Sequence, residues 1–83
     1  MAKLYKIPLL LSPQPEGGYT VTSPVLPEFM TEGDTTEEVM RNVRDALEAT
    51  LELYEDQGRP LPANLCQDTQ TEPVWFEYLV PER

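Results

Sequence analysis

The chain has 83 residues, 40% of them hydrophobic and 25% charged, which is the length and composition of one small globular domain. A domain of this size buries only a modest core. This favours a protein that self-associates or binds a partner through its remaining apolar surface over an enzyme with a deep pocket. Fifteen acidic residues against six basic ones give a net charge of −9, and so negative a field repels nucleic acid.

Several further classes are excluded by residue content. Histidine is absent from the sequence, which excludes His-based catalytic triads and His-ligated metal sites. The longest apolar run, Leu9 to Leu11, is far shorter than the roughly 20 residues that span a membrane. The single cysteine, Cys66, cannot form an internal disulfide, so we expect a reducing, cytoplasmic location.

The first half of the chain predicts short strands separated by turns. Residues 3–11 alternate as a first strand, in which Pro8 marks an edge, a bulge or a break. The Pro- and Gly-rich residues 12–18 predict a turn, residues 19–22 a second strand, and residues 29–31 a short third strand. Together these segments predict an antiparallel meander.

One long amphipathic helix is predicted from about residue 36 to residue 57. Gly58 is suited to the position just after a helix, and no Gly or Pro interrupts the segment before it. The side chains expected to face the sheet recur at helical spacing: Val39, Val43, Ala46, Leu47, Thr50 and Tyr54, widened by Met40 and Leu51.

The start of this helix carries a capping signal. Thr35 followed by Glu38 fits a capping box, in which the hydroxyl accepts a backbone N–H and the glutamate reaches back. Asp34 with Glu37 is the alternative, one residue earlier. Because the helix dipole favours negative charge at this end, Glu37 and Glu38 are interpreted as structural.

The remaining residues predict a connector and a last strand. Residues 60–73 show little pattern, whereas residues 74–80 alternate between Pro73 and Pro81 and predict a strand with one apolar face. The expected fold class is therefore α+β: a two-layer β-β-β-α-β sandwich with a mainly antiparallel sheet and one long helix. A single domain would occupy residues 1–83.

The sequence contains few of the residue arrangements that catalysis requires. A two-metal nuclease needs carboxylates that converge from several strands, and residues 3–11 contain none. Cys66 has no histidine to activate it, which favours a packed thiol over a nucleophile. The aromatic residues Trp75, Phe76 and Tyr78 are more typical of a core or subunit contact than of a binding platform. We expect no enzymatic activity, no metal and no cofactor.

The acidic face of the predicted helix is the main functional candidate. Glu48 and Glu52 are like charges four residues apart, and acidic side chains near a helix C-terminus oppose the dipole. This unfavourable placement fits either a solubilising face or a surface kept acidic for a basic partner. The candidate partner-binding residues are Glu48, Glu52, Glu55 and Asp56, with a second patch of Glu28, Glu32 and Asp34.

Four sequence motifs occur in a defined order between residues 19 and 62. They read YTVTSPVLP at residues 19–27, TEGDTTEEV at residues 31–39, NVRDAL at residues 42–47 and GRPLP at residues 58–62. This ordered set resembles the HicB family of antitoxins. The resemblance implies a partial RNase H-like fold that lacks the metal-binding carboxylates of that enzyme.

The resemblance also implies a function. A HicB-like antitoxin would bind a small basic HicA-type toxin, an mRNA interferase, and occlude its active site. It would form a homo-oligomer, a dimer or a tetramer, and would act in the cytoplasm without contacting a membrane. Many family members carry a C-terminal DNA-binding segment; none is expected in this chain, and no direct nucleic-acid binding.

Two alternatives stay open. The first is an orphan homo-oligomeric structural or interaction protein of the same fold with no toxin partner. The second is a weak metal-dependent nuclease, which only the RNase H-like shape suggests. A neighbouring toxin-like reading frame would favour the antitoxin, and tight Mg²⁺ or Mn²⁺ binding would favour the nuclease.

Overall fold

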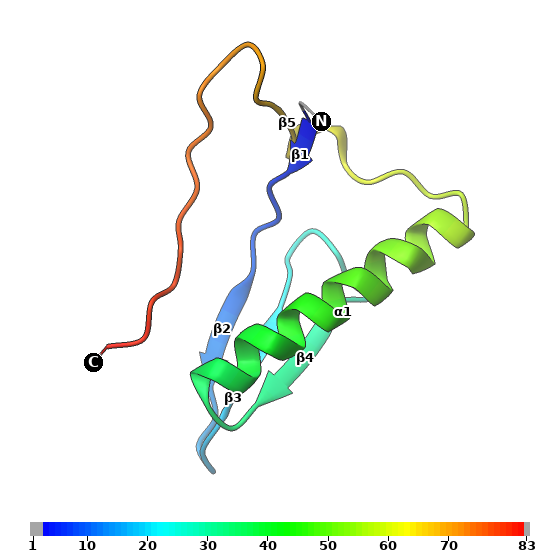
Figure 1. Ribbon diagram of the computed structural model, residues 1–83. Coiled ribbons are helices and arrows are strands. Elements are labelled where there is room, and N and C mark those ends of the chain that lie inside the picture. The colour runs from blue at the N-terminus through cyan, green and yellow to red at the C-terminus, as the bar shows by residue number, and fades with distance from the viewer. Residues whose placement is uncertain (1–2, 83) are drawn as a thin grey trace.

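The computed structural model describes residues 3–82 as a helix packed on strands, with a long extended segment at the C-terminal side (Figure 1). The elements in chain order are β1 (Lys3–Tyr5), β2 (Leu10–Pro13), β3 (Tyr19–Thr22), β4 (Met30–Gly33), α1 (Thr36–Asp56), a short 3₁₀ helix (Ala63–Leu65) and β5 (Cys66–Asp68). The strands form two small antiparallel sheets, β2-β3-β4 and β1-β5. The α+β class predicted from the sequence is confirmed.

The central sheet is the predicted meander. Val21 in β3 lies opposite Leu11 of β2 and Thr31 of β4. Gly17 and Gly18 make the tight turn between β2 and β3, with positive φ of 103° and 79°. These are backbone conformations that glycine adopts without steric cost. The third strand begins one residue later than predicted, and Phe29 before it turns into the core instead.

The prediction of one strand over residues 3–11 is wrong, because the chain breaks there into two strands that belong to different sheets. Pro8 lies in the break; it has no backbone N–H to donate, and its carbonyl accepts a hydrogen bond from Ser23 Oγ at 2.9 Å. The Lys6 N–H donates to the Leu65 carbonyl at 2.8 Å, which directs β1 away toward β5. A break at Pro8 is one of the three possibilities that the sequence allows, beside a sheet edge and a bulge.

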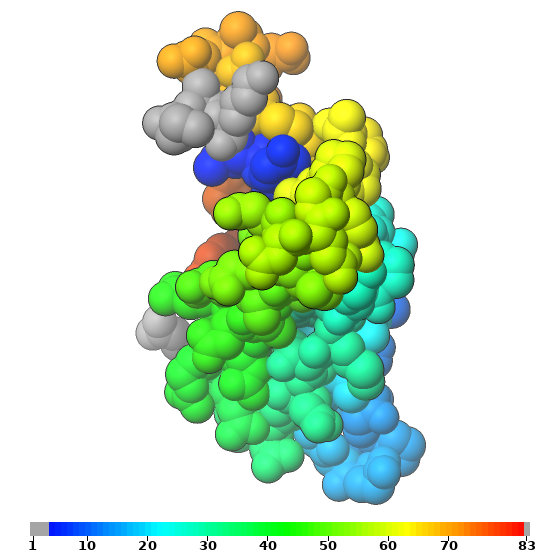
Figure 2. Space-filling view, turned by 90° about the vertical axis from the view of Figure 1, so that its right-hand side faces the viewer, coloured from blue at the N-terminus to red at the C-terminus, as the bar shows by residue number. Residues whose placement is uncertain are grey.

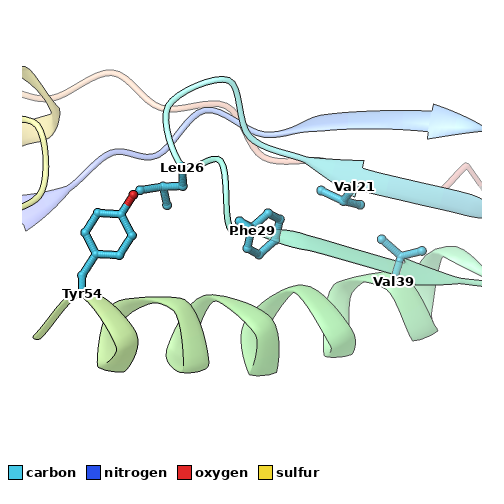
Figure 3. Packing of buried hydrophobic residues seen from close by; sticks show 5 residues of the cluster. All are labelled: Val21, Leu26, Phe29, Val39 and Tyr54. Atoms are coloured by element: carbon cyan, nitrogen blue, oxygen red, sulfur yellow. The ribbon is translucent and has the colours of Figure 1, made fainter. Parts of the chain in front are cut away.

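The helix α1 covers one face of the meander, mainly over β4 and β3, and makes the second layer. Figure 3 shows the buried cluster between the layers, formed by Val21, Leu26, Phe29, Val39 and Tyr54. The predicted apolar stripe of the helix is confirmed, since every one of its six positions is buried or half-buried. This rigid pair of layers fixes which helix side chains face outward.

Both ends of α1 carry the capping chemistry that the sequence predicted. The Glu38 N–H donates to Thr35 Oγ1 at 3.1 Å, and Glu38 Oε1 accepts from the Asp34 N–H at 2.7 Å. At the other end Gly58 adopts a φ of 64°, and the Arg59 N–H donates to the Tyr54 carbonyl at 2.9 Å. This is a Schellman end, which satisfies carbonyls that the helix leaves unpaired.

The prediction of a last strand over residues 74–80 is also wrong. Residues 73–82, which we call the arm, are extended but form no strand, and no hydrogen bond joins them to any other segment in the described chain. Trp75 is 87% exposed and Tyr78 81% exposed. The strand that follows the helix is instead β5, in which Cys66 pairs with Tyr5.

The molecule is elongated rather than spherical, with principal extents of 42 × 32 × 18 Å (Figure 2). The hairpin of β2 and β3 projects at one end and the β1-β5 ribbon at the other. The C-terminal half of α1 lies at the front of the view in Figure 2, whereas the arm is largely hidden behind it. These two segments therefore lie on opposite sides of the molecule.

Candidate partner-binding surface

The C-terminal half of α1 presents an uninterrupted acidic surface. Its members are all exposed, and we call them the acidic helix end: Asp45, Glu48, Glu52, Glu55 and Asp56. Spacings of three and four residues place Glu48, Glu52 and Glu55 in one row along the helix. No lysine or arginine occurs between residues 45 and 56, and no ion pair engages these carboxylates within the described residues.

The packing of α1 explains why this row faces outward. Thr50 and Tyr54 are buried against the sheet side, and the acidic positions lie on the opposite arc of the helix. The last helical turn contains no basic residue, so no cation within that turn offsets its carboxylates near the negative end of the helix dipole. Arg41 and Arg44 are exposed in the N-terminal half, which confines the purely acidic surface to the C-terminal half.

The predicted second patch is not one surface. Glu32 and Asp34 lie on either side of Gly33 near the start of α1, where they border a shallow polar hollow. The backbone of both residues is held by the helix: the Glu32 carbonyl accepts from Asn42 Nδ2 at 2.7 Å, and the Asp34 N–H donates to Glu38. Glu28 lies at the other end of β4, next to the end of the helix.

Glu28 is already occupied by a contact within the chain. Tyr54 Oη donates to Glu28 Oε1 at 2.9 Å, and Arg59 Nη2 donates to Oε2 at 2.6 Å. The Arg59 guanidinium also lies 4.1 Å from the centre of the Tyr54 ring. The hydrogen bond from Arg59, followed by that from Tyr54, lowers the pKa of Glu28 below its ordinary value.

This three-residue contact, which we call the Glu28 clasp, could not be read from local sequence. Tyr54 and Arg59 are 26 and 31 residues away from Glu28, so only the fold brings them together. The clasp joins the loop before β4 to the C-terminal end of α1. It compensates the Glu28 charge with Arg59, which leaves Glu32 and Asp34 as the uncompensated acidic members of the predicted second patch.

The remaining candidate residues lie apart from this surface. Cys66 is half-buried in β5, and Trp75, Phe76 and Tyr78 lie on the arm, outside the core. Within residues 3–82, no cluster of three or more His, Cys, Asp or Glu side chains could hold a metal ion. Across the same residues, α1 is the one long helix, and it is too polar to cross a bilayer.

The fold and this surface define a small two-layer α+β protein whose candidate site is a charged docking face. No protein-family model matches the chain. The chain is 44% identical over 68 residues to antitoxin HicB 1 of Photorhabdus laumondii, covering 80% of this chain and 44% of that protein. It is 39% identical over 62 residues to antitoxin HicB of Escherichia coli, covering 72% of this chain and 45% of that protein.

A third relative, a UPF0150 protein of Synechocystis, is 32% identical over 60 residues, with 72% of this chain and 76% of that protein covered. The chain therefore belongs to the family of HicB and UPF0150 proteins, and the resemblance found in the sequence is confirmed. The chain spans less than half the length of the two HicB relatives.

Proposed function

We propose that this chain is a non-enzymatic antitoxin module that binds and neutralises a small basic HicA-type mRNA interferase in the cytoplasm. The observation that carries the proposal is the acidic helix end, an exposed run of carboxylates with no cation among them. The family relatives named as HicB antitoxins support the same function. The toxin would be held against the C-terminal half of α1.

The physical argument rests on where the charge lies. Carboxylates at the C-terminal end of a helix reduce its stability by a few tenths of a kcal/mol each, so local stability does not explain them. A basic protein that approached this surface would be attracted over roughly a Debye length, which raises its association rate. Paired charges at the contact would then fix its orientation and disfavour acidic competitors.

Matched charge reversals test this surface directly. Glu48→Lys/Glu52→Lys should weaken binding of a purified HicA-type toxin by about 10-fold or more at low salt, because attraction is replaced by repulsion. Glu16→Lys/Glu72→Lys is the control, since it changes the net charge equally at exposed positions outside α1. Calorimetry would give the affinity, and RNA cleavage by the toxin would report its neutralisation.

The two variants separate specific binding from general attraction. A loss of affinity confined to the helix variant would support the acidic helix end as the interface. An equal loss in both variants would assign the effect to net charge alone, and unchanged affinity in the helix variant would exclude these residues. Glu32→Lys/Asp34→Lys tests the other uncompensated pair in the same way.

One observation favours a second candidate function. The exposed apolar arm is typical of a subunit contact, so the chain could be a homo-oligomeric interaction protein with no toxin partner. A stable oligomer isolated from its native cells at low salt with no basic protein bound would favour this alternative. Recovery of a small basic protein that dissociates at high salt would favour the antitoxin.

A further inference from the structure

Arg59 follows the acidic helix end in the chain and carries the opposite charge. It is the only basic residue between residues 45 and 82 of the sequence. Its backbone folds back on the last turn of α1, where its N–H donates to the Tyr54 carbonyl at 2.9 Å. Glu55 and Asp56 belong to that turn. Both the helix dipole and the neighbouring carboxylates attract a cation at this place, so a free Arg59 side chain would lie over the acidic helix end.

The structure instead turns the Arg59 side chain toward the loop before β4. Nη2 donates to Glu28 Oε2 at 2.6 Å, and Nη1 donates to Gln57 Oε1 at 3.0 Å. The guanidinium lies 4.1 Å from the centre of the Tyr54 ring. Within residues 3–82 no ion pair joins Arg59 to the acidic helix end. The positive charge nearest in sequence to these carboxylates is therefore used by Glu28.

Tyr54 fixes the direction in which Arg59 is held. The ring is 7% exposed and belongs to the buried cluster between helix and sheet, with its oxygen directed toward the loop that carries Leu26 (Figure 3). Tyr54 Oη donates to Glu28 Oε1 at 2.9 Å, while the guanidinium packs on the ring. One rigid side chain thus positions both partners of the ion pair.

The ion pair is also partly sheltered from water. The side chain of Arg59 is 41% exposed and that of Glu28 is 31% exposed. A charge-assisted hydrogen bond in such surroundings is screened less than a fully exposed pair. Glu55 and Asp56 are exposed and would hold the guanidinium less firmly than Glu28 does.

We propose that Glu28 is a positioning residue for the acidic helix end, because it holds Arg59 on Tyr54 and so keeps that charge away from Glu55 and Asp56. Without Glu28, the guanidinium would move to these carboxylates and compete with a basic partner for them. This inference rests on the proposed function, since it concerns the same surface. It gives Glu28 a role other than the direct partner contact predicted from the sequence.

A purely structural role for the Glu28 clasp makes a different prediction. If the clasp only supported the fold, removing Arg59 in addition to Glu28 would leave binding as weak as removing Glu28 alone. If Glu28 controls where the charge of Arg59 lies, removing both side chains removes the competing cation and restores binding. The double variant therefore separates the two roles.

Calorimetry at about 0.02 M salt would make this comparison with two probes, a purified HicA-type toxin and an oligolysine peptide of about ten residues. Glu28→Ala should bind both probes roughly 3- to 10-fold more weakly than Glu16→Ala, which removes the same charge from the exposed β2–β3 turn. Glu28→Ala/Arg59→Ala keeps the net charge of −9 and should bind within about 2-fold of the parent protein. Near 0.5 M salt the difference between Glu28→Ala and Glu16→Ala should disappear.

Proton NMR of the chain alone tests the step that precedes binding. In the parent protein the ring current of Tyr54 should displace the Arg59 methylene resonances, because the guanidinium packs on the ring. Glu28→Ala should return these resonances toward those of free arginine, whereas Glu16→Ala should leave them unchanged. Far-UV circular dichroism would verify that α1 is folded in each variant.

Three results would overturn the proposal. Binding by Glu28→Ala/Arg59→Ala as weak as that by Glu28→Ala would assign Glu28 to structural support or to direct contact with the partner. Equal affinities of Glu28→Ala and Glu16→Ala would show that Arg59 does not compete for the acidic helix end. Unchanged Arg59 resonances in Glu28→Ala would show that Glu28 does not hold this side chain. Failure of the parent protein to bind the toxin would contradict the proposed function, whereas oligolysine binding and the Arg59 resonances decide the role of Glu28 independently.

Discussion

The Glu28 clasp links stability to pH through a single carboxylate. Because Arg59 and Tyr54 lower the pKa of Glu28 in the folded protein, the folded state binds this proton less readily than the unfolded state. The resulting stabilisation is fully present above the ordinary pKa of 4.5 and is lost as the pH falls through the lowered folded value. Both oxygens are used, so an amide cannot replace the carboxylate.

We therefore predict that Glu28→Gln is less stable than the parent protein near neutral pH and that the difference shrinks at acidic pH. Urea unfolding at a series of pH values from about 7 to 3 would measure it. Glu16→Gln, in the exposed turn, controls for the loss of one negative charge. A difference between parent and Glu28→Gln that stays constant over this range would contradict the assigned cause.

Gly33 is required by close packing, not by an unusual backbone conformation. A Cβ placed on Gly33 would lie 2.9 Å from the Val39 backbone nitrogen and 2.9 Å from Val39 Cγ2. The helix start cannot give way, because the capping contacts of Thr35 and Glu38 hold it in place. Gly33 thus lets the end of β4 touch the first turn of α1.

Gly33→Ala should destabilise the protein by about 1–3 kcal/mol, which is the usual cost of overpacking a tight site. For a domain of this length each kcal/mol lowers the Tm by about 4–8 °C, so thermal unfolding would detect the change. Thr22→Ala, at an exposed position in the neighbouring strand, is the control. An unaltered Tm in Gly33→Ala would show that the helix start moves aside.

The helix α1 has opposite electrostatic requirements at its two ends. Glu37 and Glu38 in the first turn are favoured by the dipole, whereas Glu52 and Asp56 in the last turns are not. Glu52→Lys/Asp56→Lys should therefore raise stability by about 0.5–1 kcal/mol while it weakens toxin binding. Glu37→Lys, at the other end, should lower stability without affecting binding.

Thermal unfolding and calorimetry on the same samples would measure both effects. A variant that gains stability and loses affinity would show that the acidic helix end is retained at a cost to folding, as functional sites often are. If Glu52→Lys/Asp56→Lys gained stability and bound equally well, the acidic row would be a solubilising face. If it lost stability, the dipole argument itself would be wrong for this helix.

The elements differ in how well sequence predicts them, and the differences have physical causes. The helix was predicted to within one residue at its C-terminal end because Thr35, Glu38 and Gly58 specify its ends through local hydrogen bonds. A strand forms only where a second strand lies beside it, and alternation within one segment does not show whether such a partner exists. Residues 74–80 alternate, but no strand lies beside them in the structure, so the predicted strand does not form. The strand β5 was missed because three residues with a polar centre carry no alternating signal.

The placement of the candidate acidic residues was predictable where they belong to one helix; their role as a binding site stays a prediction. Glu48, Glu52 and Glu55 share a row because helical spacing alone places them there. The second patch failed as a unit because Glu28 and Glu32 lie toward opposite ends of β4, and strand direction was needed to separate them. The Glu28 clasp depends on contacts between distant segments, which spacing within one element does not reveal.

The molecule as a whole places two kinds of surface on opposite sides. One side presents the carboxylates of the acidic helix end, and the other presents the exposed apolar side chains of the arm. Salt acts differently on these surfaces. It screens attraction between exposed opposite charges, whereas contact between apolar surfaces is insensitive to screening.

Raising the salt concentration from about 0.05 M to about 0.5 M shortens the screening length several-fold. The affinity for a basic toxin should then fall steeply, because its attraction to the acidic helix end is screened. Self-association through the arm should hold or tighten, because two chains of net charge −9 repel each other less at high salt while the apolar contact persists. Calorimetry with the toxin and ultracentrifugation of the chain alone would follow both constants in the same buffers. If both constants weakened in parallel, charge pairs rather than apolar contact would dominate the arm surface, and the two surfaces would not be physically distinct.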